Sequence, residues 1–332
     1  MATLSVTNPT LLDLAKVTDP DGSIAAVVEI LNETNEVLAD MSWMEGNLPT
    51  GHRTTVRTGI PTPTWRKLYG GVQPNKSSTV QVTDNTGMLE SYAEVDKALA
   101  DLNGNTAAFR LQEDRPHIEG MNQEITDTLF YGNESTEPEA FTGLAPRFAN
   151  LTADANSENV LNGGGSGTDN ASVWLVVWGP NTCHGIITDK GQVTLEDASD
   201  GSNSGRMEAY RTHYRWDAGL SVRDWRYIVR IANIDKSALI RTYNAGTFAT
   251  GAILPDLMYQ AMRRIPNLSA GRPAFYLSRD IATMVARQSS AMGNANAVTL
   301  DSVAADNKMT ERFHGIPMRR VDSLSADEAA LT

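Results

Sequence analysis

Cysteine is almost absent from this sequence: Cys183 is the single one among 332 residues. One thiol cannot form a disulfide within the chain, and it cannot supply an all-cysteine metal site. A chain of this length buries roughly 75% of the surface that its unfolded form exposes, so it needs no such crosslinks. We therefore expect a globular protein of roughly two domains, in which Cys183 is a buried structural residue.

Long hydrophobic runs are also missing. The densest apolar stretch, residues 173–178, has six residues, whereas a membrane-spanning helix needs about 20. The first ten residues carry no basic side chain, which is unlike a secretory signal. These two absences predict a soluble, intracellular-type chain that has no membrane as a partner.

Basic residues are too few to balance the acidic ones. The chain has 28 lysines and arginines against 40 aspartates and glutamates, a formal net charge of −12. Such a deficit argues against sequence-specific DNA binding, which needs a basic surface. The imbalance is also uneven, because residues 1–50 carry a net −7, residues 51–90 a net +3 and residues 91–140 a net −8. These charges either solvate exposed faces or dock the basic segment onto an acidic one, within a chain or between copies.

Catalytic and metal-binding patterns are not found. The five histidines are isolated, the glycine-rich loop 162–167 lacks the lysine of a phosphate loop, and no nucleophile elbow occurs. Cys183 and His184 are adjacent, but neighbouring residues of a strand point to opposite faces. His213 is expected to be a hydrogen-bonded histidine. We predict no catalytic, cofactor-binding or metal-binding residues, and hence a structural protein rather than an enzyme.

Residues 51–90 have the pattern of a long two-stranded hairpin. Residues 54–58 alternate between branched and charged or polar side chains, and residues 79–83 form a second extended stretch. Pro61 and Pro63 exclude a helix between them, and the connecting loop contains Trp65, Arg66, Lys67 and Tyr69. A two-stranded hairpin is marginally stable alone in water, so we expect this one to lie on an acidic surface.

The longest predicted helix covers residues 103–131. Thr106 occupies a suitable capping position, and the helix should end at Gly132. Its predicted apolar stripe consists of Ala107, Ala108, Leu111, Ile118, Met121, Ile125 and Leu129. Pro116 interrupts the pattern, so we expect a kink near residues 114–115.

The remaining elements are mixed. Residues 11–40 are predicted to be helical and acidic, like an arm. Further strands are predicted at 88–95, 173–178, 185–188, 225–231 and 315–321, and further helices after Pro255 and after Ser278. Strands and helices do not alternate regularly, which favours an α+β fold.

The order of these segments, together with local sequence, resembles the major capsid proteins of tailed bacteriophages, which share the Hong-Kong-97-type fold. The podovirus-type capsid family is the one that the chain resembles. The stretches that carry the resemblance run from about residue 10 to the end of the chain: NLPTGHRTTVR (47–57), NGNTAAFRL (103–111), LFYGN (129–133), VWLVVWG (173–179), YRTHY (210–214), VRDWRY (222–227) and FHGIP (313–317).

The resemblance implies a division of the chain. Residues 1–50 would be the N-terminal arm, and residues 51–90 the extended loop that reaches over a neighbouring subunit. Residues 91–139 would be the peripheral domain, with residues 103–131 as its spine helix. Residues 140–312 would be the axial domain, and residues 313–332 would contain a strand that returns to the sheets.

It also implies the function. Copies would assemble as pentamers and hexamers into an icosahedral shell around double-stranded DNA, contacted non-specifically, in a virion built within the host cytoplasm. Portal and scaffolding or decoration proteins would be further partners. Our hypothesis for the contacts between subunits is that Arg53, Arg57, Arg66 and Lys67 pair with acids on a neighbour's spine helix or arm. The alternatives are an encapsulin-like compartment and a soluble hydrolase.

Overall fold

The computed structural model describes residues 35–102, 106–189, 194–198, 208–239, 251–291, 298–302, 309–324 and 327–332. Its helices are α2 (Val37–Asp40), α3 (Lys97–Ala100), α4 (Thr106–Tyr131), α5 (Leu144–Arg147), α7 (Leu254–Arg264) and α8 (Arg279–Ala291), with 3-10 turns η1 (Ala155–Asn159), η2 (Trp225–Tyr227) and η3 (Leu268–Ala270). Its strands are β1 (Trp43–Glu45), β2 (Gly51–Gly59), β3 (Ser78–Asp96), β4 (Val160–Asn162), β5 (Asn170–Trp178), β6 (Cys183–Asp189), β7 (Thr194–Ala198), β8 (Ala209–Val222), β9 (Ile228–Asp235), β10 (Arg272–Leu277), β11 (Val298–Ser302), β12 (Met309–Phe313) and β13 (Ile316–Arg320).

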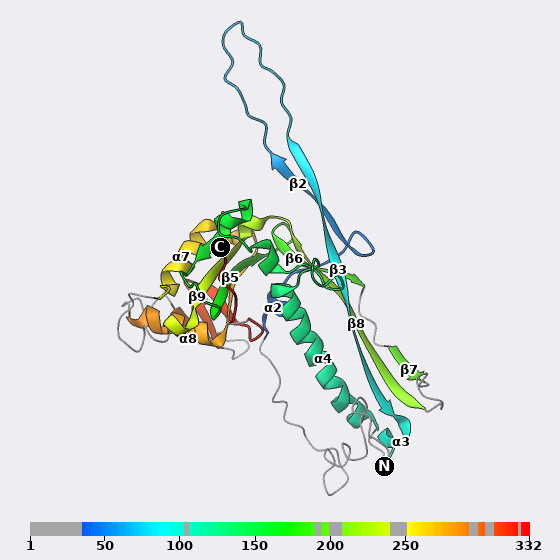
Figure 1. Ribbon diagram of the computed structural model, residues 1–332. Coiled ribbons are helices and arrows are strands. Elements are labelled where there is room, and N and C mark those ends of the chain that lie inside the picture. The colour runs from blue at the N-terminus through cyan, green and yellow to red at the C-terminus, as the bar shows by residue number, and fades with distance from the viewer. Residues whose placement is uncertain are drawn as a thin grey trace.

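A mixed sheet runs through the part of the molecule that the structure describes (Figure 1). Its strands follow the order β11-β12-β13-β10-β5-β6-β8-β3-β2, and β9 pairs with both β5 and β4. The mixture of parallel and antiparallel pairs with separate helices confirms the predicted α+β class. None of the described helices is both long and apolar enough to cross a membrane.

Strand β5 lies in the middle of the core, and every residue of it is buried. Because side chains alternate between the faces of a sheet, its odd-numbered residues face one cluster and its even-numbered residues another. Val173, Leu175 and Val177 pack with residues of α7 and α8. Trp174 and Trp178 pack with the end of α4 and the segment that follows it. This two-sided burial explains the continuous apolar run in the sequence.

The predicted hairpin exists, and its second strand is longer than expected. Strand β2 pairs with the first part of β3, and β3 then continues without a break to pair with β8 from Thr86 to Asp96. The two separate strands predicted at 79–83 and 88–95 are therefore one strand of 19 residues. The upper part of β3 projects beyond the body of the molecule, while its lower part lies against α4 (Figure 1).

Helix α4 matches the predicted long helix from Thr106 onward, and it is continuous through Pro116. The stripe predicted for its first half is wrong: Leu111 and Ile118 are 54% and 52% exposed, and Phe109 is buried instead. The second half is as predicted, because Met121, Ile125 and Leu129 are buried. Only this half reaches the central core, and the first half projects beside β3 and β8 (Figure 1).

Most of the other predicted strands and helices are present, and one strand begins later than predicted. The strands near 173–178, 185–188 and 315–321 and the helices after Pro255 and Ser278 are present. The strand predicted from residue 225 begins at Ile228, since Trp225 lies in the turn η2 that Asp224 caps. Most of the helical arm predicted over 11–40 lies outside the described residues, which begin at Asn35.

Candidate assembly surface

The hairpin of β2 and β3 leaves the body at a buried polar cluster. His52 of β2 lies opposite Asp84 of β3, and both side chains are buried. The Asp84 carboxylate accepts hydrogen bonds from Arg147 Nη2 and from Ser221 Oγ, each at 2.9 Å. Because Arg147 belongs to α5 and Ser221 to β8, the cluster ties the hairpin to two other elements of the subunit.

Two histidine rings are in contact at this root. The rings of His52 and His184 meet edge to face at 5.6 Å between centroids, and Arg223 Nη2 lies 2.9 Å from His52 Nε2. Burial and the positive charge of Arg223, with a smaller effect of His52, lower the pKa of His184 from 6.5 to about 4. Burial and Arg223 also lower the pKa of His52, against the opposing effect of Asp84. Both imidazoles are therefore neutral at pH 7.

Above the root, the hairpin has two chemically different faces. One face carries His52, Thr54 and Val56 of β2 with Val80 and Val82 of β3. This face is buried at His52, whereas Val80 and Val82 are 50% and 38% exposed. The apolar face thus continues from the core onto the projecting hairpin, where its valines are exposed. Exposed apolar surface of this kind is typical of a site that another molecule covers.

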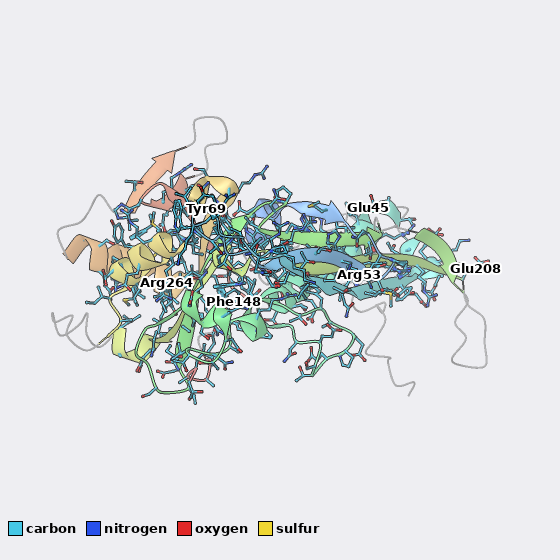
Figure 2. All side chains as sticks on the ribbon, turned by 90° about the horizontal axis from the view of Figure 1, so that it is seen from above. Glu45, Arg53, Tyr69, Phe148, Glu208 and Arg264 are labelled. Carbon is cyan, nitrogen blue, oxygen red and sulfur yellow. The ribbon has the colours of Figure 1, made fainter. Side chains whose placement is uncertain are left out.

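The opposite face and the loop are basic. Arg53 and Arg57 lie on this face of β2 beside threonines and glutamine, and Arg66 and Lys67 lie in the loop between the strands. The loop also exposes Trp65 and Tyr69 completely, and Tyr69 has a left-handed backbone, with φ of 63°. Arg53 of the hairpin and Tyr69 of its loop are labelled in Figure 2.

The four predicted contact residues have no ion-pair partner in the part of the subunit that the structure describes. Arg53, Arg57, Arg66 and Lys67 are exposed, and no ion pair among the described residues includes any of them. Arg53 Nε donates only to Thr83 Oγ1, at 3.4 Å.

Two acids of the arm already have an internal partner. Arg319 of β13 binds Asp40 at 2.9 Å and Glu36 at 3.0 Å. These carboxylates at the end of the acidic arm are therefore engaged by the C-terminal strand of the same subunit.

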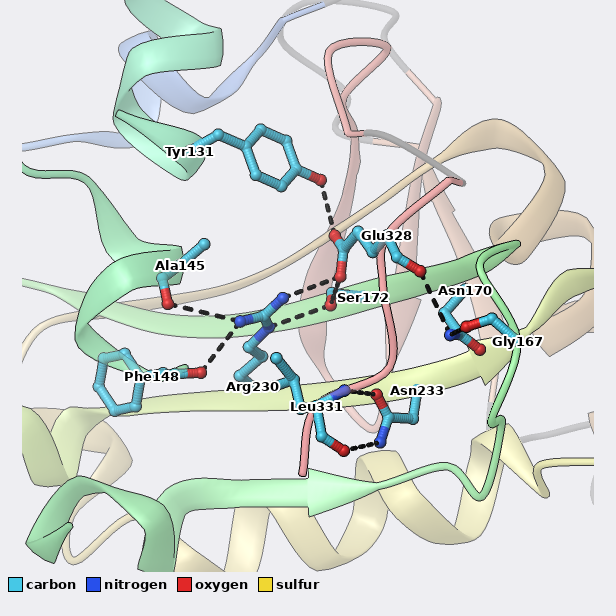
Figure 3. Close-up of polar contacts among 10 residues, drawn as sticks. All are labelled: Tyr131, Ala145, Phe148, Gly167, Asn170, Ser172, Arg230, Asn233, Glu328 and Leu331. Carbon is cyan, nitrogen blue, oxygen red and sulfur yellow. Dashed lines mark hydrogen bonds and ion pairs between the residues drawn. The ribbon is translucent and has the colours of Figure 1, made fainter. Parts of the chain in front are cut away.

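A second buried polar cluster fastens the C-terminal segment to the body (Figure 3). The Glu328 carboxylate accepts hydrogen bonds from Arg230 Nη2 at 2.8 Å and from Tyr131 OH at 2.7 Å, and it also accepts one from Ser172 Oγ. Arg230 Nη1 donates in addition to the carbonyl oxygen of Phe148 at 2.9 Å. One carboxylate thus joins the end of α4 to strands β5 and β9.

Backbone contacts continue this attachment. The backbones of Glu328 and Asn170 exchange hydrogen bonds. The backbone of Leu331 exchanges hydrogen bonds with the side chain of Asn233, at 2.8 and 3.1 Å (Figure 3). Asn233 has a positive φ of 56°, a conformation that costs free energy for a residue other than glycine. These bonds to Leu331 offset that cost.

The cysteine and histidine predictions are confirmed where the structure tests them. Cys183 is a free, buried thiol whose pKa is raised by burial, so it remains protonated. His213 Nε2 lies 3.2 Å from Glu90 and its ring stacks on Tyr92. In the part of the chain that the structure describes, no three histidine, cysteine or acidic side chains form a metal-binding group.

Sequence reasoning missed both buried clusters. Arg230 did leave a signal, because it is the one charged residue in the apolar stretch 228–234, and a buried charge requires a partner. His52 and Asp84 left none, since their proximity depends on a register that local sequence does not define.

A family model and one solved structure indicate the type of protein. The family model described as "Major capsid protein GP7" matches residues 19–332. A chain in a structure of bacteriophage Epsilon15 is 37% identical, with a TM-score of 0.74 and 100% of both chains covered. The capsid of bacteriophage JBD30 is 12% identical, with a TM-score of 0.50, over 97% of this chain and 100% of that one, and it shows the fold alone. No curated protein matches the chain.

Proposed function

The chain belongs to the GP7 family of major capsid proteins, and on this premise we propose that its copies associate as pentamers and hexamers through the β2–β3 hairpin. The protein is a structural component of a tailed-phage virion, not an enzyme, and it assembles with copies of itself into an icosahedral shell. The podovirus-type resemblance of the sequence is thereby confirmed, and the hydrolase and encapsulin alternatives are set aside.

One observation carries the proposal: among the residues that the structure describes, none covers or pairs with either face of the projecting hairpin. Val80 and Val82 are exposed on one face, and Arg53 and Arg57 have no ion-pair partner among the described residues on the other. A two-stranded ribbon is marginal in water. A neighbouring subunit that covers the valines and supplies carboxylates to the arginines stabilises both faces at once.

We assign the parts of the subunit in the same way. Residues 1–50 act as the arm, 51–90 as the extended loop, 91–139 as the peripheral domain with its spine helix, 140–312 as the axial domain around the symmetry axes, and 313–332 as the returning segment. The buried Glu328 cluster supports the last assignment, because it joins α4 to β5 and β9.

The contents of the shell follow from the charge. A subunit with a net charge of −12 repels phosphate over distances near the Debye length. The shell would therefore enclose packaged double-stranded DNA without binding it tightly, and it would contact the DNA without sequence preference. A portal at one vertex and scaffolding or decoration proteins complete the set of partners that we propose.

Charge reversal tests the role of the hairpin. The variant Arg53→Glu/Arg57→Glu should fold like the unmodified chain but form few or no closed shells when examined by electron microscopy. The matched variant Arg53→Lys/Arg57→Lys keeps both charges and should still assemble. Shells of normal size and yield from the charge-reversed variant would contradict the proposal.

A further inference from the structure

Two parts of the sheet meet at a narrow junction. We call them the β5 part, which contains β5, β9 and β10, and the β8 part, which contains β6, β8 and β3. Within the β8 part, β3 and β8 pair continuously from Thr86 to Asp96. Between the two parts, the described residues of β5 and β6 pair at a single position, Trp178 with Cys183. Because cross-strand pairs are what stabilise a sheet, the angle between the two parts depends on further contacts.

Helix α4 is fastened to the β8 part. His117 Nδ1 lies 2.7 Å from Ser91 Oγ of β3, and Arg110 Nη2 donates to Thr212 Oγ1 of β8 at 3.4 Å. The guanidinium of Arg110 also covers the ring of Tyr210, at 4.7 Å from the ring centroid. These contacts hold the first half of α4 on β3 and β8, so the helix moves together with these strands.

The end of α4 meets the β5 part through an aromatic contact. Phe130 is fully buried, and its ring centroid lies 6.2 Å from that of Trp174 on β5 and 6.2 Å from that of Tyr276 on β10. Burial of apolar surface is favourable in proportion to the area and has no preferred direction. This contact therefore holds the end of the helix in place, but it defines the direction of the helix axis poorly.

Glu328 adds a directional contact at the same end of α4. Its two carboxylate oxygens bind different parts of the molecule (Figure 3). Oε1 accepts the 2.7 Å hydrogen bond from Tyr131, the last residue of α4. Oε2 accepts hydrogen bonds from Arg230 of β9, at 2.8 Å, and from Ser172 of β5. Since hydrogen bonds weaken steeply as they depart from linearity, this carboxylate favours one orientation of α4 relative to β5 and β9.

The Glu328 carboxylate is itself held in position on the β5 part. Arg230 Nε donates to Ser172 Oγ at 3.1 Å, which fixes the two donors relative to each other. The backbone of Glu328 pairs with that of Asn170 at the start of β5. Because the backbone and Oε2 are both bound, the position that Oε1 offers to Tyr131 is defined by the β5 part.

We propose that the hydrogen bond between Tyr131 and Glu328 restricts the angle between α4 and the β5 part, and thereby keeps assembled shells at one diameter. Repeated contacts close into a shell of defined size only when they meet at a defined angle. Tyr131 and Glu328 are thus positioning residues for assembly. This inference rests on the proposed function and deepens it, because it names residues that determine the size of the shell.

A matched pair of variants tests this inference in assembled particles. Tyr131→Phe keeps the ring and removes the bond from α4 to Oε1, whereas Ser172→Ala removes a bond to Oε2 that does not involve α4. Shells purified from each variant are sized by electron microscopy. We expect a single diameter for the unmodified chain and for Ser172→Ala, and a mixture of several diameters for Tyr131→Phe.

The outcomes separate this inference from the function on which it rests. Shells of one unchanged diameter from Tyr131→Phe, or an equal spread of diameters from Ser172→Ala, would overturn the inference and leave hairpin-mediated assembly standing. Complete loss of shells in Tyr131→Phe would also overturn it, because the inference concerns their size and not their formation. If the unmodified chain forms no shells, the proposed function fails and this inference fails with it.

Hydrogen exchange of the unassembled subunit tests the contact without assembly. In Tyr131→Phe, the backbone amides of residues 126–131 should exchange faster by roughly tenfold, because the end of α4 opens more often when this bond is lost. In Ser172→Ala, the same amides should exchange nearly as in the unmodified chain. Equal exchange of these amides in the two variants would show that the bond does not orient α4.

Discussion

At the scale of single residues, the buried pair of Arg230 and Glu328 dominates the attachment of the C-terminal segment. Their side chains are 5% and 8% exposed. Removal of one partner from a buried pair leaves an uncompensated charge, which typically costs about 3–5 kcal/mol. We expect Glu328→Ala to lower the free energy of unfolding of the unassembled subunit by that amount, measured by denaturant titration.

The matched control is Glu311→Ala, which removes the partner of Arg320 from a more exposed pair. Exposed pairs contribute about 0–1 kcal/mol, so this variant should be nearly neutral. Equal effects of the two substitutions would contradict the role that we assign to the Glu328 cluster.

The histidines at the hairpin root predict a dependence of stability on pH. Because the pKa of His184 falls from 6.5 to about 4 on folding, the unfolded chain binds a proton in this range that the folded chain does not. Stability is therefore lost as the pH falls from about 6.5 to about 4, by roughly 3 kcal/mol in total. Arg223, His52 and Asp84 are the charged or titratable groups that act on the ring, and the opposing effect of Asp84 does not reverse this sign.

Unfolding free energies measured between pH 7 and pH 4 should show this loss beyond the contribution of the carboxylates. The variant His184→Asn removes the titrating group and should have a shallower pH dependence over the same interval. Identical slopes for the two proteins would show that His184 is not the group responsible.

Prediction of single residues from the sequence succeeded where a local pattern was sufficient. Cys183 was expected to be buried because lone cysteines usually are, and it is. The exposure of Arg53 and Arg57 follows from strand alternation. The cluster of His52, His184 and Asp84 combines three strands, and its formation depends on tertiary packing that no local pattern encodes.

At the scale of elements, the two faces of the hairpin give a matched pair of variants. Val80 and Val82 lie on the face that continues into the core, and Thr79 and Gln81 lie on the other face of the same strand. A valine buried in a contact contributes about 1.5 kcal/mol or more, so its loss weakens the contact roughly tenfold. We expect Val80→Ser/Val82→Ser to raise the subunit concentration needed for assembly, as measured by light scattering.

The subunit itself should keep its stability in this variant, because both valines are exposed before assembly. The control Thr79→Ser/Gln81→Ser changes the opposite face and should have a smaller effect on assembly. The interpretation of the valine face is wrong if both variants shift the concentration equally.

Elements with a strong period were predictable, and elements shaped by their neighbours were less so. The buried strand around Trp174 and the helix after Pro255 follow from apolar runs and helix-start signals. The exposed Leu111 and Ile118 on α4 do not, because the first half of this helix projects away from the core (Figure 1). Its apolar residues are then available for contacts that a single chain does not show.

At the scale of the whole molecule, the charge blocks predict how assembly responds to salt. Attraction between the basic hairpin and an acidic neighbour is screened as the Debye length falls from about 10 Å at 0.1 M to about 3 Å at 1 M. Assembly should therefore weaken with added salt, as followed by light scattering. The neutralised variant Arg53→Gln/Arg57→Gln should respond less to salt, and a response equal to that of the unmodified chain would exclude these charges from the contact.

The class of the fold and the type of protein were accessible from the sequence, whereas the strand order was not. Segment order and several short stretches pointed to a capsid protein, and the family comparison confirms this. The pairings of β3 with β8 and of β5 with β10 join strands that are far apart in the chain. Such pairings depend on side chains meeting across the core, which local propensity does not specify.

Strand β3 gives the subunit a mechanical property. A strand of 19 residues extends about 65 Å at 3.4 Å per residue, and the same backbone serves the projecting hairpin and the sheet that α4 covers. A pull on the hairpin by an adjoining subunit would therefore load the β3–β8 ladder in shear, where many hydrogen bonds share the force. Pressure from inside the shell would therefore act as tension along the backbone of β3, which has no break between the hairpin and the sheet.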